Sequence, residues 1–275
     1  MKTFTWLSML LTSLILVSSC SSYKPQYSSA AKDWELKPFD SLRQPVHTMY
    51  LIGDAGNQTL QNAAPVLKYL KSRLATETQN SSLLFMGDNI YDNGMPPVQD
   101  SLKRKIAEYR IVSQLETLDE FKGKPFFIPG NHDWNGWGKE GLKRQEDFIE
   151  NYLSKKRKAS GEDFDNYFLP DDGCSGPEAI ELNDNVVIIV IDSQWWLADW
   201  DKDYKINEGC TIKNRATFTF LFENMVRKYK NKNVVIAMHH PPYTYGPHGG
   251  GSTLRQHIFP LVDLNPKLYI PLPVR

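Results

Sequence analysis

Short apolar runs alternate along this chain with longer stretches in which apolar positions recur every three or four residues. The short runs are rich in β-branched and aromatic residues and end in polar, glycine-rich sequence, which predicts buried strands, whereas the longer stretches predict amphipathic helices. The expected strands lie at 46–54, 81–88, 124–133, 185–194 and 233–240. The expected helices lie at 60–76, 98–118, 140–153 and 215–230. This alternation predicts an α/β fold in which helices flank a central sheet.

Two regions stand outside the alternation. Residues 154–184 are basic at the sequence KKRK and rich in Gly, Asp and Pro, and we interpret the basic run as a solvated surface. The C-terminal residues 263–275 contain three prolines and no helical pattern. We therefore place no helix or strand in either region.

The first twenty residues have the character of a targeting signal. Lys2 precedes an apolar run at 4–17, which is followed by Ser-Ser-Cys and is short for a membrane-spanning helix. Small residues before Cys20 resemble a bacterial lipobox, which is cleaved before a lipid-modified cysteine. An ordinary signal peptide with an incidental cysteine is the alternative.

These features divide the chain into three expected parts, which are a lipoprotein signal peptide over 1–19, a polar, proline-containing tether over 20–45, and a folded domain over 46–275. The domain would then be held at the membrane of a bacterial cell envelope, outside the cytoplasm, through a lipid on Cys20. Which leaflet carries it and which way it faces stay open.

Composition and charge narrow the classes of partner. The chain has 275 residues, of which 41% are apolar, enough to fill a sizeable core. It carries 32 basic and 32 acidic residues, so its net charge gives no reason to expect a nucleic acid partner. Beyond Cys20 the only cysteines are Cys174 and Cys210. In an oxidising compartment they can form a disulfide, but their spacing is equally compatible with two free thiols. Nothing in the sequence indicates the oligomeric state.

Polar side chains collect where the expected strands end. In sheets of this type, ligands and catalytic groups gather at the carboxyl ends of the strands. Carboxylate, amide, phenol and imidazole groups suit iron, zinc and manganese, and the lack of cysteine argues against a structural zinc finger or a thiolate nucleophile. The set is Asp54, Asp88, Tyr91, Asn131, His132, Asp133, Asp192, His239 and His240. Taken singly, each could be a turn residue, a helix cap or a structural histidine.

The order of four short motifs is more specific than any single residue. G-D-x-G at 53–56 is followed by G-D-N-x-Y at 87–91, G-N-H-D at 130–133 and H-H-P at 239–241. This order resembles the calcineurin-like metallophosphoesterase superfamily and, within it, the purple acid phosphatases, in which a tyrosine follows the second aspartate by three positions. The resemblance extends over about 46–248.

The resemblance implies a layered αββα sandwich with a binuclear metal centre. Asp88 would bridge the two metals, and Asp54 and Tyr91 would bind a trivalent iron. Asn131 and His239 would bind a divalent ion, which the ligand types allow to be zinc, manganese or iron. Asn89 and Asp92 would shape the loop rather than bind metal.

The implied reaction is hydrolysis of a phosphate monoester by hydroxide that the two metals generate. His132 would contact the phosphate and protonate the leaving oxygen, and Asn131 would also contact the phosphate. His248, in the glycine-rich segment 243–252, would meet the substrate phosphate or face solvent. The substrate would be a phosphorylated small molecule or a nucleotide-like compound. A phosphodiesterase on the same scaffold is the nearest alternative.

One family motif is absent from this sequence. Family members carry a G-H-x-H block after the H-x-P segment, and its two histidines complete the metal shells. Three explanations are compatible with its absence here. The chain is a truncated piece of a complete enzyme, His248 or His257 replaces the missing ligands, or the chain is a non-catalytic envelope lipoprotein that keeps the scaffold as a binding module.

Overall fold

The computed structural model describes residues 45–60, 64–158 and 166–242, together with 258–259, 261 and 267–269. The expected signal peptide and tether, and with them Cys20, lie outside the described residues, as do His248 and His257. The chain separates into two units, and the one formed by Pro45–Pro241 contains every helix and strand named below. Among the described residues, none of the helices combines the length and the apolar character needed to span a membrane.

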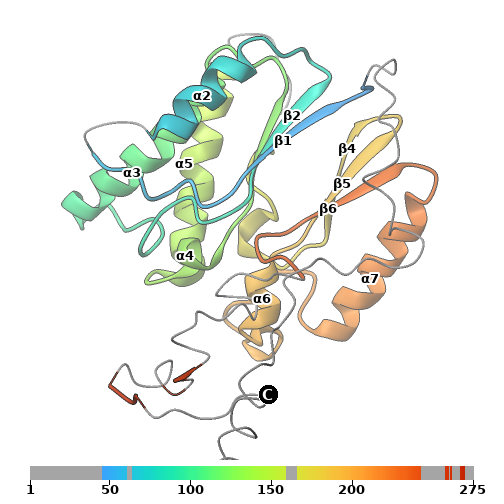
Figure 1. The fold of residues 1–275 in the computed structure, drawn as a ribbon. Coiled ribbons are helices and arrows are strands. Elements are labelled where there is room, and N and C mark those ends of the chain that lie inside the picture. The colour runs from blue at the N-terminus through green and yellow to red at the C-terminus, as the bar shows by residue number, and fades with distance from the viewer. Residues whose placement is uncertain are drawn as a thin grey trace, which may run out of the picture. The chain divides into compact units, whose positions relative to one another are not determined.

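Six strands form two three-stranded sheets (Figure 1). The first sheet has the order β1-β2-β3, and its strands are parallel. The second sheet has the order β4-β5-β6, in which β4 is antiparallel and β6 parallel to β5. The strands are β1 (Thr48–Ile52), β2 (Ser81–Phe85), β3 (Lys124–Phe127), β4 (Glu178–Asn183), β5 (Val186–Val190) and β6 (Asn233–Ala237).

The longer helices follow the predicted ranges closely. They are α2 (Pro65–Leu74), α3 (Ser101–Leu115), α5 (Gly138–Lys158) and α7 (Arg215–Lys228). Shorter helical segments are η2 (Glu116–Leu118), α4 (Asn131–Trp134), η3 (Asp171–Gly173), α6 (Ser193–Leu197) and η4 (Trp200–Lys202).

The region 154–184 differs from the expectation of a structureless insert. It contains the end of α5 and the strand β4. The basic run is not wholly solvated, because Arg157 is buried and donates hydrogen bonds to the carbonyl groups of Gly123 and Phe121. A buried guanidinium that binds carbonyl oxygens ties α5 to the loop before β3.

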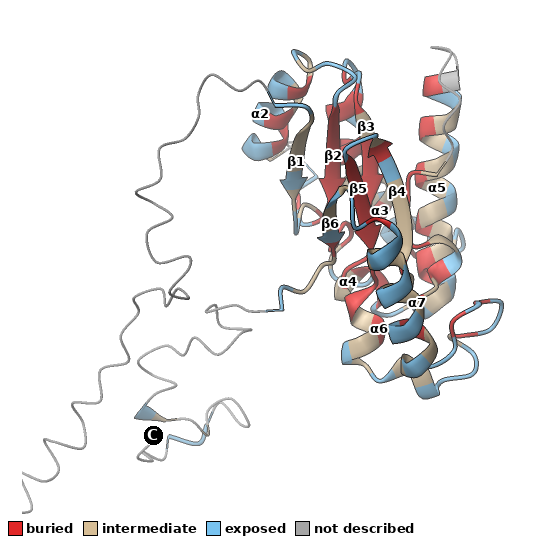
Figure 2. Ribbon diagram, turned by 90° about the vertical axis from the view of Figure 1, so that its right-hand side faces the viewer, coloured by how far each residue is buried: buried red, intermediate tan, exposed pale blue. Residues whose placement is uncertain are grey.

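Alternation along the strands builds two separate cores. On β2, Leu83 and Phe85 point to one face and pack against helices α2, α3 and α5, while Leu84 points to the other face. Leu84 packs there with residues of β5, such as Ile188, so that this second core lies between the sheets. The buried residues are concentrated on the central strands (Figure 2). The result is the layered α/β fold that the sequence predicted, with two sheets flanked by helices.

A disulfide joins Cys174 to Cys210, with an S–S distance of 2.03 Å and a Cα–Cα distance of 5.6 Å. The two cysteines are 36 positions apart in sequence. The bond therefore closes a loop that contains β4, β5 and α6. The sequence alone had left this pairing open.

Candidate active site

The two aspartates that follow β1 and β2 emerge at the same edge of the first sheet. These strands are parallel, and Ile52 lies opposite Phe85, so Asp54, two residues after β1, and Asp88, three residues after β2, leave their strands at the same edge of the sheet. Both residues have positive φ, 57° for Asp54 and 55° for Asp88, a conformation that costs energy for any residue except glycine. The backbone N–H of Asp54 donates to the carbonyl of Gly87, which links the two loops.

Glycine is needed where three loops meet beneath the carboxylates. A Cβ atom on Gly130 would lie 2.3 Å from Oδ1 of Asp88. A Cβ atom on Gly87, whose φ is 92°, would lie 2.7 Å from both the Gly130 nitrogen and Nδ1 of His239. Both glycines of the motifs therefore allow an approach that a side chain would block.

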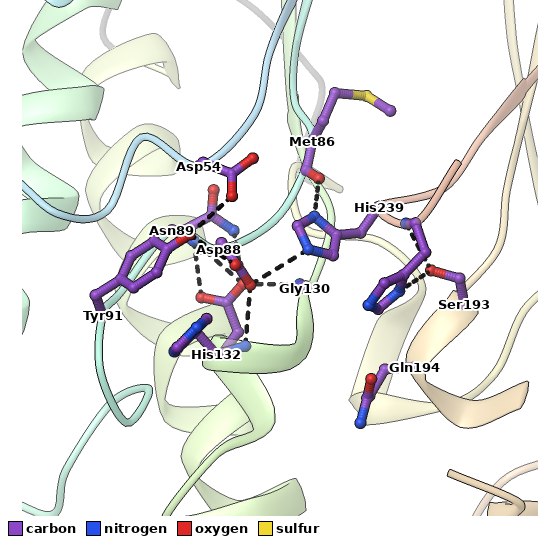
Figure 3. Close-up of polar contacts among 12 residues, drawn as sticks. Asp54, Met86, Asp88, Asn89, Tyr91, Gly130, His132, Ser193, Gln194 and His239 are labelled. Atoms are coloured by element: carbon purple, nitrogen blue, oxygen red, sulfur yellow. Dashed lines mark hydrogen bonds and ion pairs between the residues drawn. The ribbon is translucent and has the colours of Figure 1, made fainter. Parts of the chain in front are cut away.

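The Tyr91 hydroxyl lies between the two carboxylates (Figure 3). It is 2.7 Å from Oδ1 of Asp54 and 2.8 Å from Oδ2 of Asp88. Burial, followed by the hydrogen bonds to these carboxylates, raises the pKa of the Tyr91 phenol well above its usual range. Among the described residues, no lysine or arginine forms an ion pair with Asp54 or Asp88. Two carboxylates that pair with no lysine or arginine, beside a phenol oxygen, are a set of donors that suits a hard cation.

The second oxygen of Asp88 faces a histidine from the other sheet. Oδ1 accepts the backbone N–H of His132 at 2.9 Å and lies 3.5 Å from Nε2 of His239. Nδ1 of His239 lies 2.8 Å from the carbonyl oxygen of Met86, which can only accept, so Nδ1 carries the proton. In the neutral ring, Nε2 then presents its lone pair toward Asp88, the arrangement that a metal-binding histidine requires.

Helix α4 positions the two remaining predicted residues. It begins at Asn131, directly after the loop that follows β3, and both Asn131 and His132 are half-buried at the site edge. The His132 ring packs on Tyr91 with 4.1 Å between ring centroids, and its Nδ1 lies 2.9 Å from the carbonyl oxygen of Asp92. Because that carbonyl binds Nδ1, Nε2 of His132 is left for a further partner.

Asp133 has a structural role rather than a ligand role. It is fully buried, and its carboxylate accepts backbone N–H groups from Asn89, Ile90 and Gly130. Burial raises the pKa of Asp133 to about 6. This carboxylate fixes the loop after β2 against the loop after β3 and so sets the position of Asp88.

Asp192 is likewise occupied within the fold. It is fully buried, accepts the indole N–H of Trp134 at 2.7 Å, and caps α6 through the backbone N–H of Gln194 at 2.8 Å. Burial raises the pKa of Asp192 to about 7. Of the four aspartates at strand ends, only Asp54 and Asp88 therefore offer their carboxylates to the site.

Several supporting contacts had no signal in the sequence. On α3, Arg110 donates to the carbonyl of Tyr91 and Gln114 donates to the carbonyl of Asn89 at 2.8 Å, which holds the loop that carries Tyr91. Ser193 accepts the backbone N–H of His240 at 3.0 Å, and its hydroxyl lies 2.9 Å from Nδ1 of the same residue. These partners are far apart in sequence, so no local pattern reveals them.

The fit to a metal can be judged from the ligand types. Within the described residues there is no group of three or more His, Cys, Asp or Glu side chains arranged to hold a metal. The side chains that do lie close together are those of Asp54, Asp88, Tyr91 and His239, which supply two carboxylates, a phenol and an imidazole. This donor set fits the metal ions expected from the sequence.

Comparison with known proteins gives one family. A family model described as calcineurin-like phosphoesterase matches residues 47–270, which is most of the chain and includes the four motifs. Searches of the curated proteins and of the solved structures gave no match.

Proposed function

Since the chain belongs to the calcineurin-like phosphoesterase family, whose fold and activity imply metal-dependent hydrolysis of phosphoester bonds, we propose that it hydrolyses phosphate monoesters at a binuclear metal centre. The observation that carries the proposal is the position of the Tyr91 hydroxyl within hydrogen-bond distance of both Asp54 and Asp88. A phenol at this point adds a third oxygen ligand and favours iron.

The residues divide into two ligand groups. Asp54, Tyr91 and Asp88 would hold a trivalent iron, and Asp88, with Asn131 and His239, would hold a zinc, manganese or second iron ion. When bound, two such ions neutralise charge on phosphate oxygens and lower the pKa of water toward neutrality. Asp88 suits the shared position because its two oxygens face different partners.

His132 is proposed to act on the substrate and not on the metals. The Asp92 carbonyl accepts the proton on Nδ1 and so orients the ring, and only the doubly protonated imidazolium form would carry a second proton, on Nε2, for the departing oxygen. Contact with the Tyr91 ring, at an angle of 32° between the ring planes, holds the ring in place. Asn131 and His248 are proposed to contact the phosphate, in a substrate that is a phosphorylated small molecule or a nucleotide-like compound.

Tyr91 is also the observation that favours a monoesterase over a phosphodiesterase, which would use the same scaffold. A comparison of p-nitrophenyl phosphate with bis-p-nitrophenyl phosphate as substrates separates the two activities.

We further propose that the chain is an envelope lipoprotein whose residues 1–19 are removed and whose Cys20 carries the lipid, on the strength of the sequence alone.

The experiment that tests the proposal combines metal content, visible absorption and hydrolysis on the purified chain. We expect two metals per chain, one of them iron, with a tyrosinate absorption band. Tyr91→Phe removes the phenolate and should abolish this band and lower hydrolysis by about 100-fold or more, because a metal ligand is lost. Tyr69→Phe, at an exposed tyrosine of α2, is the matched control and should change neither.

Two results would contradict the proposal. A chain that binds no stoichiometric metal after reconstitution cannot work in this way. Hydrolysis that survives Asp88→Asn unchanged would show that the carboxylate between the two ligand groups is not used. The first result would favour the alternative, a non-catalytic scaffold kept for binding.

A further inference from the structure

A cavity of about 890 Å³ lies outside the candidate active site, between the start of α3 and one face of α5. Its wall on α5 is formed by side chains three and four positions apart, which is the spacing of one helix face. The cationic and aromatic side chains of the lining are those of Arg104, Arg144, Phe148, Tyr152, Lys155 and Lys156. The volume is that of a small-molecule pocket.

The lining carries an excess of positive charge. Four cationic side chains face the cavity, and Asp147 is the only acidic one in its lining. Arg104 is paired with Glu108 and Lys156 with Asp119, both outside the lining. Within the described part of the chain, Arg144 and Lys155 form no ion pair.

Two guanidinium groups are crowded at one end of the cavity. Arg144 donates from Nε to the carbonyl of Met95 at 3.1 Å, and its two terminal nitrogens have no hydrogen-bond partner among the described residues. Burial and then the charge of Arg104 lower the pKa of Arg144. Arg104 donates to the neighbouring carbonyl, that of Pro96, at 3.0 Å. An anion placed between these groups would relieve their repulsion and use the open donors.

Two aromatic rings continue the same face of α5. Phe148 and Tyr152 are half-buried and one helical turn apart. The Arg104 guanidinium lies 5.9 Å from the Phe148 ring centre, and the Lys156 ammonium lies 5.8 Å from that of Tyr152. Rings flanked by cations offer a surface on which a flat ring can stack beside a bound anion.

We propose that this cavity binds a phosphate-bearing molecule with a flat aromatic ring, of the size of a nucleoside monophosphate. The phosphate would lie against Arg104 and Arg144, with the ring over Phe148 and Tyr152, and the ammonium of Lys155 in the lining would add to the attraction for the anion. None of the lining residues belongs to the candidate metal centre, so the proposal does not depend on the hydrolysis proposed above.

The test is calorimetric titration of the whole chain with adenosine monophosphate, inorganic phosphate and adenosine, in excess chelator so that no metal-dependent hydrolysis occurs. Lys155→Gln and Arg144→Gln each remove one cation from the lining of the cavity. Lys105→Gln removes an exposed lysine of α3 outside the lining and is the matched control. His132→Ala reports on binding in the candidate active site.

We expect one molecule of adenosine monophosphate per chain, bound at least about 10-fold more tightly than phosphate or adenosine alone, since each part supplies contacts that the other lacks. Arg144→Gln should weaken this binding by about 10-fold and Lys155→Gln by a smaller factor, while Lys105→Gln and His132→Ala leave it unchanged. If Arg144→Gln does not fold, as judged by circular dichroism, Lys155→Gln decides.

Three outcomes would overturn the proposal. The first is no detectable binding of adenosine monophosphate. The second is binding that Lys155→Gln leaves unchanged. The third is binding that His132→Ala abolishes, which would place the ligand in the candidate active site. Adenosine that binds as tightly as its monophosphate would remove the role assigned to the two guanidinium groups.

Discussion

Four aspartates that lie after strands have two different kinds of surroundings in this molecule. Asp54 and Asp88 carry positive φ and direct their carboxylates at the Tyr91 hydroxyl. Asp133 and Asp192 are fully buried and bind backbone or indole N–H groups. Burial without a cation favours the neutral carboxyl, which is why the pKa of each buried aspartate is raised.

The raised pKa of Asp192 predicts a pH dependence of stability. Its pKa rises from 3.8 to about 7 on folding, so between about pH 4 and pH 7 the folded chain holds a proton that the unfolded chain has lost. The stabilisation is present at low pH and is lost as the pH rises, by at most about 1.4 kcal/mol per pH unit. Urea denaturation from pH 4 to pH 7 should give a shallower decline for Asp192→Asn than for the natural chain.

The decline in stability must be compared between the natural chain and the Asp192→Asn variant, because other carboxyl groups also titrate between pH 4 and pH 7. Burial raises the pKa of Glu146 to about 7, for example, and both chains share that contribution. Parallel curves for the two chains would show that Asp192 does not retain a proton in the folded state.

At the scale of the elements, strand ends and the glycines beside them fix the site. Gly53 and Gly87 occupy the same position in their Gly-Asp motifs, although Gly53 is one residue after β1 and Gly87 is two residues after β2. Their surroundings differ, because a Cβ on Gly53 would meet its nearest atom at 3.7 Å, an ordinary contact, whereas Gly87 has a φ of 92° and contacts of 2.7 Å. The motif looks the same at both positions, yet only one of them excludes a side chain.

This contrast gives a matched pair of variants. Gly87→Ala should lower the free energy of unfolding by about 2 kcal/mol or more, from the unfavourable φ and from the overlap with Gly130 and His239. Gly53→Ala should change it by less than about 1 kcal/mol, since the new methyl group has room. Equal effects of the two substitutions in chemical denaturation would contradict the close approach described for Gly87.

Most elements were predictable from the sequence, and the motif order predicted candidate ligands, of which the structure brings Asp54, Asp88, Tyr91 and His239 together. Strands with long apolar runs, such as β2, and the motif order carried that information. The strand β4 was missed because it lies at a sheet edge and only one of its residues, Leu182, is buried, so its pattern is weak. The contacts of Arg110 and Ser193 were missed because they join residues distant in sequence, which no periodicity encodes.

At the scale of the whole molecule, stability depends on the packing of two sheets and on one covalent link. The inner core joins Leu84 and Phe126 of the first sheet to Ile188 and Val190 of the second. The disulfide encloses β4 and β5 but no strand of the first sheet. It therefore constrains β4, β5 and α6, and leaves β6 and the first sheet to their own packing.

Removing the disulfide should destabilise the domain. A closed loop of this length lowers the entropy of the unfolded chain by an amount equivalent to about 4 kcal/mol at 25 °C, and the double variant Cys174→Ser with Cys210→Ser loses that contribution. The measurement is guanidinium denaturation with and without a reducing agent. Reductant should shift the midpoint of the natural chain toward that of the variant and leave the variant unchanged. A natural chain whose midpoint does not respond to full reduction would contradict the prediction.

The candidate ligands come from both sheets, so the complete set depends on the packing of one sheet against the other. Asp54, Asp88 and Tyr91 belong to the first sheet and its loops, while His239 follows β6 of the second. A chain whose sheets have formed but not yet packed together would present oxygen donors alone, the kind that hard ions prefer. The imidazole joins them when the inner core closes. The full set of candidate ligands therefore exists only once the two sheets have packed together.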